Sequence, residues 1–103
     1  MIRICIAGAT GWAGRALVAG VIDADDLVLR SAVARSAAGS DLGTALGRGA
    51  LDVPVYGSVA EALDGVDVLV DYTSHVAVKA NALAAVERGV AVVIGASGFV
   101  ALE

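Results

Sequence analysis

The chain has 103 residues, of which 58% are hydrophobic, and its formal net charge is −4. This length fits one domain of roughly 100–150 residues, and so apolar a composition predicts a sheet covered on both faces rather than a disordered chain. The seven basic residues are scattered along an acidic chain, which argues against a nucleic-acid-binding surface. The longest uncharged stretch, Gly89–Leu102, is shorter than the ~20 apolar residues that a membrane-spanning helix needs.

The single cysteine, Cys5, lies in an apolar run near the start of the chain. One cysteine cannot form an intrachain disulfide, and a metal cluster is not expected around it. No basic segment followed by an apolar stretch and a cleavage site opens the sequence. We therefore expect a cytoplasmic protein without a bound metal, in which this cysteine is a small apolar residue of a strand.

The first half of the chain predicts a strand, a glycine-rich turn, a helix and a second strand. An apolar run at Ile2–Ala7 ends at a glycine, helical spacing of apolar residues extends over Trp12–Ile22, and aliphatic residues return at Leu27–Ala34. This order predicts one βαβ unit with a right-handed crossover. The segment 35–52 is rich in alanine, glycine and serine and contains one short helical candidate, Asp41–Leu46.

The next segment predicts a short strand and a short helix. Val53–Tyr56 has the character of a strand, but Pro54 cannot donate to a ladder and favours an edge position. Ser58 precedes the helical candidate Val59–Leu63. Glu61 lies three residues after Ser58, which is the spacing of a capping box.

The last part of the chain predicts two further strands with a helix between them. The strands are Val66–Val70 and Val90–Ile94, and the helix runs from about Val76 to Arg88. Lys79 is expected to lie outside the buried face of this helix. The residues expected on that buried face are Val76, Ala80, Leu83 and Ala84. Because strands alternate with helices throughout, we expect ligands to bind beyond the carboxyl ends of parallel strands, where the strand order reverses.

Three glycines, Gly8, Gly11 and Gly14, lie between the first strand and the first helix. Their spacing differs by one residue from the commonest dinucleotide fingerprint, but it places glycine where the strand turns, where backbone meets a pyrophosphate and where helix packs on strand. The helix N-terminus would attract the phosphates, and we expect Trp12 to cover the turn. The fold class predicted over residues 1–103 is α/β, a Rossmann-like open parallel sheet with helices on both faces, truncated after the fifth strand. A tight turn without any ligand is the alternative.

About twenty residues beyond the last glycine, NAD-binding proteins place an acidic residue against the ribose hydroxyls. Here the sequence is Ala34-Arg35-Ser36. A guanidinium and a hydroxyl can hold a 2′-phosphate, and no carboxylate is present to repel it. Arg35 therefore predicts NADP as the preferred cofactor, with NAD as the second choice; the alternative is a solvated loop cation.

Several polar residues lie near the expected ligand edge. Hydroxyl groups that could contact a ligand, or simply cap a helix or bridge a turn, belong to Thr10, Thr73, Ser74 and Ser97. His75 is the only histidine and is more typical of a surface or capping position than of a general base. Asp71 is expected to fix the following loop through backbone N–H groups. No catalytic residue is therefore assigned.

Three segments that follow strands, Gly8–Arg15, Asp71–Thr73 and Val93–Phe99, together resemble the amino-terminal domain of dihydrodipicolinate reductase. This family, also called 4-hydroxy-tetrahydrodipicolinate reductase, serves bacterial lysine and diaminopimelate biosynthesis with NADH or NADPH. The resemblance covers nearly all of the chain. It implies that Gly8–Ala13 hold the pyrophosphate and that Gly95–Ser97 support the nicotinamide end. The complete expected cofactor site is Gly8, Ala9, Thr10, Gly11, Trp12, Ala13, Arg35, Thr73, Gly95, Ala96 and Ser97.

The sequence also departs from the pattern of this family. Ala34 stands where an acidic residue is common, and Ala96 replaces a threonine of the usual Gly-Thr-Thr-Gly, whereas Ser97 keeps the hydroxyl. The family's substrate domain has no counterpart in the sequence, so we expect the chain alone to be inactive. Two other interpretations stay open: a non-catalytic NADP-binding regulator, and an assembly module that forms a homo-oligomer through an exposed apolar edge.

Overall fold

Within residues 1–73 and 75–95, which the computed structural model describes, five parallel strands form one sheet in the order β3-β2-β1-β4-β5. The strands are β1 (Ile2–Ala7), β2 (Leu27–Val33), β3 (Val55–Tyr56), β4 (Val68–Asp71) and β5 (Ala91–Ile94). The helices are α1 (Trp12–Asp23), the 3₁₀-helix η1 (Arg35–Ala37), α2 (Leu42–Ala45), α3 (Val59–Ala62) and α4 (His75–Glu87). The strand order reverses between β1 and β4, and the predicted Rossmann-like parallel sheet is confirmed.

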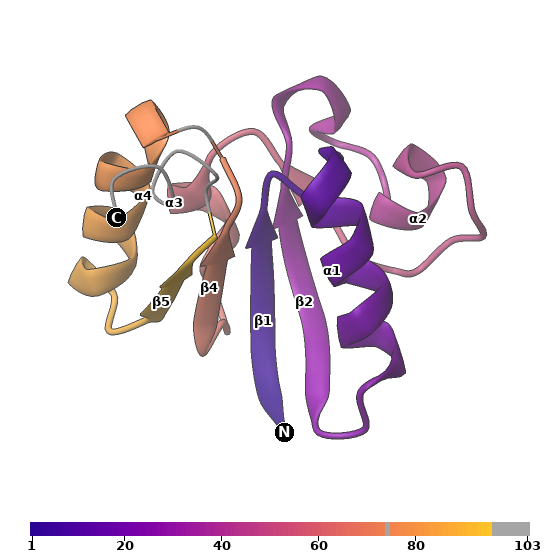
Figure 1. The fold of residues 1–103 in the computed structure, drawn as a ribbon, viewed down its shortest axis with the longest axis horizontal. Coiled ribbons are helices and arrows are strands. Elements are labelled where there is room, and N and C mark those ends of the chain that lie inside the picture. The colour runs from indigo at the N-terminus through magenta and orange to yellow at the C-terminus, as the bar shows by residue number, and fades with distance from the viewer. Residues whose placement is uncertain (74, 96–103) are drawn as a thin grey trace.

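Two apolar cores cover the two faces of the sheet. The first core joins β1 to α1 and α2 and includes Ile6 and Val18. The second joins β1 and β4 to α3 and α4 and includes Cys5, Leu69 and Ala85. Figure 1 shows α1 and α2 grouped on one side of the sheet and α3 and α4 on the other. Because successive side chains of a strand point to opposite faces, the uninterrupted apolar run of β1 supplies both cores.

The edges of the sheet are β3 and β5. β3 pairs only with β2 among the described residues, as Pro54 predicted, and Pro54 itself forms an isolated antiparallel bridge with Asp41. At the opposite edge, β5 carries apolar side chains that remain exposed, Val93 at 54% and Ile94 at 42%. The predicted helix after Ser58 is present, but the Ser58 hydroxyl donates to the Glu61 carboxylate (2.8 Å) and caps no helix N–H.

The buried face of α4 differs from the predicted one. Of the predicted residues, Ala84 does pack against the second core, but Ala80 is exposed and Leu83 is 60% exposed. Val78 and Ala85 are buried instead, and the side chain of Val76 lies outside the described part of the structure. Apolar residues surround this helix almost completely, so their spacing carries no information about which side faces the sheet. The inward face also contains the partly buried Asn81, whose amide donates a hydrogen bond to the buried carboxylate of Asp71.

The carboxylate of Asp41 organises the segment 41–53, for which the sequence predicted only one short helix. It accepts hydrogen bonds from the N–H groups of Thr44 (3.1 Å), Leu51 (3.0 Å) and Val53 (2.9 Å). These bonds, led by the one from Leu51, lower the pKa of Asp41. One side chain thus caps α2 and holds the return of the chain toward β3.

Arg3 and Asp67 form an ion pair between β1 and the start of β4. The guanidinium donates to both carboxylate oxygens, at 3.0 and 3.1 Å, and the backbone N–H of Arg3 donates to Oδ2 at 2.8 Å. The side-chain hydrogen bond from Arg3 is the largest cause of the lowered pKa of Asp67, from an ordinary 3.8 to about 2. Both side chains are partly exposed, so solvent screens the attraction.

A carboxylate whose pKa is lowered by folding stabilises the fold above its unfolded-state pKa, and this contribution is lost as the pH falls through its folded-state pKa. We therefore expect the free energy of unfolding to decrease between pH of about 4 and about 2, and to decrease less for Asp67→Asn. Urea denaturation followed by circular dichroism over this pH range measures the difference. Asp64→Asn, at an exposed carboxylate without an ion pair among the described residues, is the matched control. Identical pH dependence of wild type and Asp67→Asn would contradict the stabilising role of the ion pair.

Candidate cofactor site

The chain turns sharply at Gly8, immediately after β1. Gly8 has φ +80°, which L side chains rarely adopt, and a Cβ there would lie 2.9 Å from the carbonyl oxygen of Tyr72. Its N–H donates to the carbonyl oxygen of Val33 at 2.9 Å. The turn is therefore held between the ends of β2 and β4, and only glycine fits it.

Gly14 and Gly11 serve the turn differently. A Cβ at Gly14 would overlap the carbonyl oxygen of Gly8, so this glycine lets α1 pack against the turn. A Cβ at Gly11 would have one close neighbour, the Gly8 oxygen at 3.3 Å, and its φ of −71° suits any residue. The backbone dihedral angle of Gly11 therefore does not demand glycine, and the tight contact with the Gly8 oxygen is the only constraint on a side chain there among the described residues.

The first N–H groups of α1 have no intrahelical acceptors, as at the start of any α-helix, and Gly11 at the N-cap has no side chain that could accept from them. Arg15 Nε donates to the carbonyl oxygen of Thr10 at 3.2 Å and ties the loop to the helix. The expectation that Trp12 covers the turn is wrong, since its side chain is 93% exposed. Gly14 and Val18 mark the buried side of α1, and Trp12 lies on the opposite side.

A cavity of about 420 Å³ lies at the carboxyl edge of the sheet, beside the point where the strand order reverses. The residues of the expected site that line it are Gly8 and Thr10 from the turn, Arg35 after β2 and Thr73 after β4. These residues come from three separate strand ends, and the fold brings them together.

The other expected site residues have different positions. Ala9 is buried in the first core, and its side chain belongs to packing. Gly11, Trp12 and Ala13 lie at the start of α1 rather than in the wall of the cavity. Gly95 follows β5 and packs against the ring of Tyr72, which a Cβ at Gly95 would overlap. Ala96, Ser97 and the hydroxyl candidate Ser74 lie outside the described residues.

Seven further residues, none of them in the expected site, also line the cavity: Val33, Ala34, Gly57, Ser58, Val59, Ala77 and Asn81. The segment 57–59 follows β3, so it belongs to the same carboxyl edge as the predicted loops. Ala77 and Asn81 are four residues apart on α4, the spacing that places two side chains on one helix face. Correct orientation of α4 would therefore have identified both of them.

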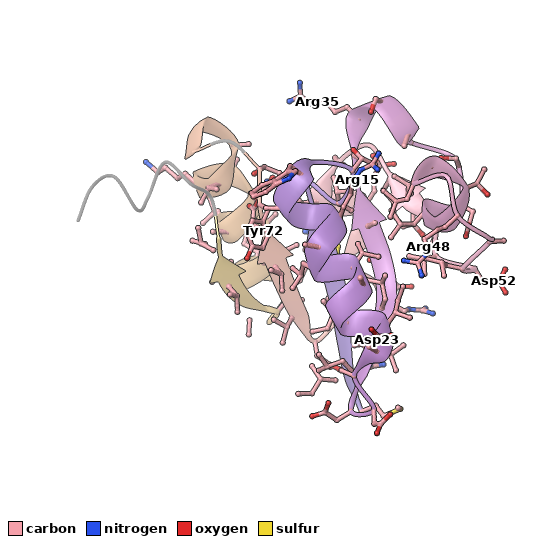
Figure 2. All side chains as sticks on the ribbon, turned by 45° about the vertical axis from the view of Figure 1, so that its right-hand side comes forward. Arg15, Asp23, Arg35, Arg48, Asp52 and Tyr72 are labelled. Carbon is pink, nitrogen blue, oxygen red and sulfur yellow. The ribbon has the colours of Figure 1, made fainter. Side chains whose placement is uncertain are left out.

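Arg35 is exposed and begins η1 directly after β2. Figure 2 shows its side chain extending away from the ribbon, whereas Arg15 lies close to the start of α1. The Arg35 guanidinium forms no ion pair and no side-chain hydrogen bond with the rest of the described chain. It is therefore available to an anionic group at the mouth of the cavity.

Asp71, at the end of β4, is completely buried and fixes the loop that follows, as the sequence predicted. Its Oδ1 accepts from the N–H of Thr73 at 2.9 Å and from the Thr73 hydroxyl at 2.5 Å, and its Oδ2 accepts from Asn81 Nδ2 at 3.1 Å. Cys5 on the neighbouring strand is equally buried, and burial raises the pKa of its thiol to about 11. The thiol therefore stays neutral and belongs to the core.

No three or more histidine, cysteine, aspartate and glutamate side chains gather into a metal-binding group in residues 1–73 and 75–95. No helix in the same ranges is both long and apolar enough to cross a membrane.

The parallel sheet, the glycine turn that leads into α1 and the cavity beside the reversal of strand order define a Rossmann-like domain of the dinucleotide-binding class. The sequence model of the family described as "Dihydrodipicolinate reductase, N-terminus" matches residues 2–103, and the chain belongs to this family. The resemblance stated from the three motifs is confirmed, and the interpretations as a regulator or an assembly module are not favoured.

Curated relatives are named 4-hydroxy-tetrahydrodipicolinate reductase. The protein of Anaeromyxobacter sp. (strain Fw109-5) is 43% identical over 100 residues, which cover 96% of this chain and 37% of the relative. The protein of Thermosynechococcus vestitus is 38% identical over 103 residues, which cover 94% of this chain and 37% of the relative. The chain therefore spans a little over a third of the length of these relatives.

Solved structures agree with the fold. Dipicolinate-bound dihydrodipicolinate reductase from Paenisporosarcina sp. TG-14 matches with a TM-score of 0.78 and 26% identity, over 95% of this chain and 38% of that protein. Aspartate semialdehyde dehydrogenase with NADP from Candida albicans also gives 0.78, with 19% identity over 96% of this chain and 30% of that protein. At that identity, the second likeness shows a shared fold alone.

We expect substitutions of Gly11 and Gly14 to have different effects, the first on ligand binding and the second on stability. We expect Gly11→Val to weaken dinucleotide binding by at least about tenfold while the circular dichroism spectrum is retained, because the new side chain occupies the approach to the backbone. Gly14→Ala should instead destabilise the fold by about 1–3 kcal/mol, because its Cβ overlaps the Gly8 oxygen. Fluorescence titration with NADPH and urea denaturation measure the two effects.

Gly20→Val is the matched control for Gly11→Val, because Gly20 lies in α1 with open space around it. This control should bind NADPH like the wild type. Unchanged affinity of Gly11→Val would remove the first turn of α1 from the ligand site.

Proposed function

We propose that this chain binds a nicotinamide dinucleotide at the cavity and is the cofactor-binding domain of an NAD(P)H-dependent 4-hydroxy-tetrahydrodipicolinate reductase of lysine and diaminopimelate biosynthesis. The observation that carries the proposal is the convergence of Gly8, Thr10, Arg35 and Thr73 on one cavity at the carboxyl edge of the sheet. Family membership supports the reaction class, and the proposed domain comprises residues 1–103.

The residues of this chain fit such a cofactor by their chemistry. The N–H groups at the start of α1 suit the pyrophosphate, which the segment Gly8–Ala13 would surround. Gly95 would support the nicotinamide end together with Ala96 and Ser97. When bound, the cofactor supplies the hydride, and this chain supplies binding and orientation.

NADP is the cofactor we propose as preferred, because Arg35 is a cation after β2 with no ion pair in residues 1–73 and 75–95, at a place where a carboxylate would favour NAD. Ala34, beside it, is buried and lines the same cavity, so it presents no negative charge to a 2′-phosphate. A guanidinium matches the geometry of a phosphate, to which it can donate two parallel hydrogen bonds.

Arg35→Ala should weaken the binding of NADPH and leave the affinity for NADH nearly unchanged. A hydrogen bond to a charged group contributes about 1.5–3 kcal/mol, and the exposure of Arg35 places the expected loss at the lower end, about tenfold in affinity. Calorimetric titration of both cofactors at one ionic strength measures this difference. Arg48→Ala, at an exposed arginine near α2, should bind both cofactors like the wild type. Equal losses for NADH and NADPH in Arg35→Ala would mean that Arg35 maintains the loop and does not recognise the phosphate.

The 103-residue chain by itself should not turn over the cyclic substrate of the family. The residues that line the cavity are suited to binding, and the chain spans little more than a third of its curated relatives. NADPH oxidation with freshly generated substrate tests this expectation, with the reductase of Anaeromyxobacter sp. as the positive control. Turnover of about 1 per second or faster would show a complete active site in this chain.

A further inference from the structure

Thr73 and Asn81 form a polar wall of the cavity, and both bind the buried carboxylate of Asp71. Thr73 follows β4, and Asn81 lies on the inward face of α4, so the two side chains reach the wall from different elements. Asn81 Nδ2 also lies 3.3 Å from the Thr73 hydroxyl oxygen. The three residues therefore form one closed hydrogen-bonded group behind the cavity.

The protons of this group can be assigned from the chemistry of its members. An ionised carboxylate only accepts hydrogen bonds, and three donors converge on Asp71. The Thr73 hydroxyl therefore donates its single proton to Asp71 and keeps its lone pairs. The Asn81 amide nitrogen directs its two protons at Asp71 Oδ2 and Thr73 Oγ1.

The remaining atom of this group, Asn81 Oδ1, faces no donor in the described chain. Its hydrogen bonds all run through Nδ2, and no buried side-chain oxygen or nitrogen in the described residues lacks a partner, so Oδ1 is accessible to solvent. Because Asn81 lines the cavity, this accessible oxygen is an acceptor at the wall. The wall thus offers a ligand hydrogen-bond acceptors, of which Asn81 Oδ1 is the main one. The side-chain donors of Thr73 and Asn81 are already used within the group.

We infer that Asp71 is a positioning residue that sets Thr73 and Asn81 as hydrogen-bond acceptors, so that this wall recognises the exocyclic amino group of an adenine base. The inference rests on the proposed function. The same cavity contains Arg35 and Ala34, where the ribose of the adenosine half is expected, whereas Gly95 at the nicotinamide end lies outside it. Val59 and Ala77 give the cavity apolar surface against which a planar base can pack.

A base that carries a keto oxygen in place of the amino group would bring an acceptor against these acceptors. The probes are therefore NADH and its reduced deamino analogue, in which hypoxanthine replaces adenine. Neither has a 2′-phosphate, so Arg35 does not enter the comparison. The wild type should bind NADH about tenfold more tightly than the deamino analogue, the size of effect expected when an acceptor that the bound base shields from water loses its donor.

Asp71→Asn should reverse this preference although residue 71 does not line the cavity. The new amide accepts from Thr73 with its oxygen and presents its NH₂ to residue 81. Two amide nitrogens cannot bond each other, so the Asn81 amide turns over and directs its NH₂ at the cavity. The deamino analogue should then bind at least as tightly as NADH, a result that loss of packing alone does not produce.

Asn81→Ala is the second variant, and it keeps the test decisive if Asp71→Asn does not fold. Its ratio of affinities for the two probes should fall to about one, because the acceptor at the wall is gone. Calorimetric titration gives the ratios, and circular dichroism confirms that each variant is folded. Absence of binding of NADH and NADPH by the wild type would overturn the proposed function. Binding of both probes with equal affinity by the wild type, or a ratio unchanged in the folded variants, would overturn this inference alone.

Discussion

At the end of β1 the backbone of Gly8 lies against the ends of both neighbouring strands, with no room for a side chain. Its N–H bonds the carbonyl oxygen of Val33 on one side, and the carbonyl oxygen of Tyr72 lies on the other. The position of α1 follows from this turn, because Gly14 packs against the Gly8 oxygen. Gly8 therefore fixes the relative positions of three elements: the N-terminus of α1, the loop with Arg35 and the loop with Thr73. The cavity lies between them.

The fold was predictable because each strand and each long helix carries its own local signal. The order of apolar runs and glycines gave the βαβ unit, and Pro54 indicated an edge strand. The cavity was predictable only as far as it is built from strand ends, which meet at one edge of any parallel sheet. The wall formed by α4 was not, because that helix is apolar almost all round and its inward side includes Asn81, whose contact with Asp71 ten residues away leaves no trace in the apolar spacing.

Trp12 illustrates a second limit of prediction from the sequence. A large aromatic residue beside a glycine turn suggested burial, yet the inward positions of α1 begin at Gly14, and Trp12 lies on the other side of the helix. The sequence pattern of α1 contains this information in the spacing of Gly14, Val18 and Val21. Residue size alone was therefore misleading, while helical geometry was sufficient.

The exposed β5 edge also bears on how copies of the chain behave toward one another in solution. The strand contains no charge and no proline, and Val93 and Ile94 are exposed on its two faces, features that favour strand pairing between molecules. The opposing force is the long-range repulsion between chains that each carry a net charge of −4. Dissolved salt screens this repulsion beyond roughly 10 Å at 0.1 M but leaves the attraction between apolar edges in place. Pairing of separate chains at this edge is therefore expected to increase with ionic strength.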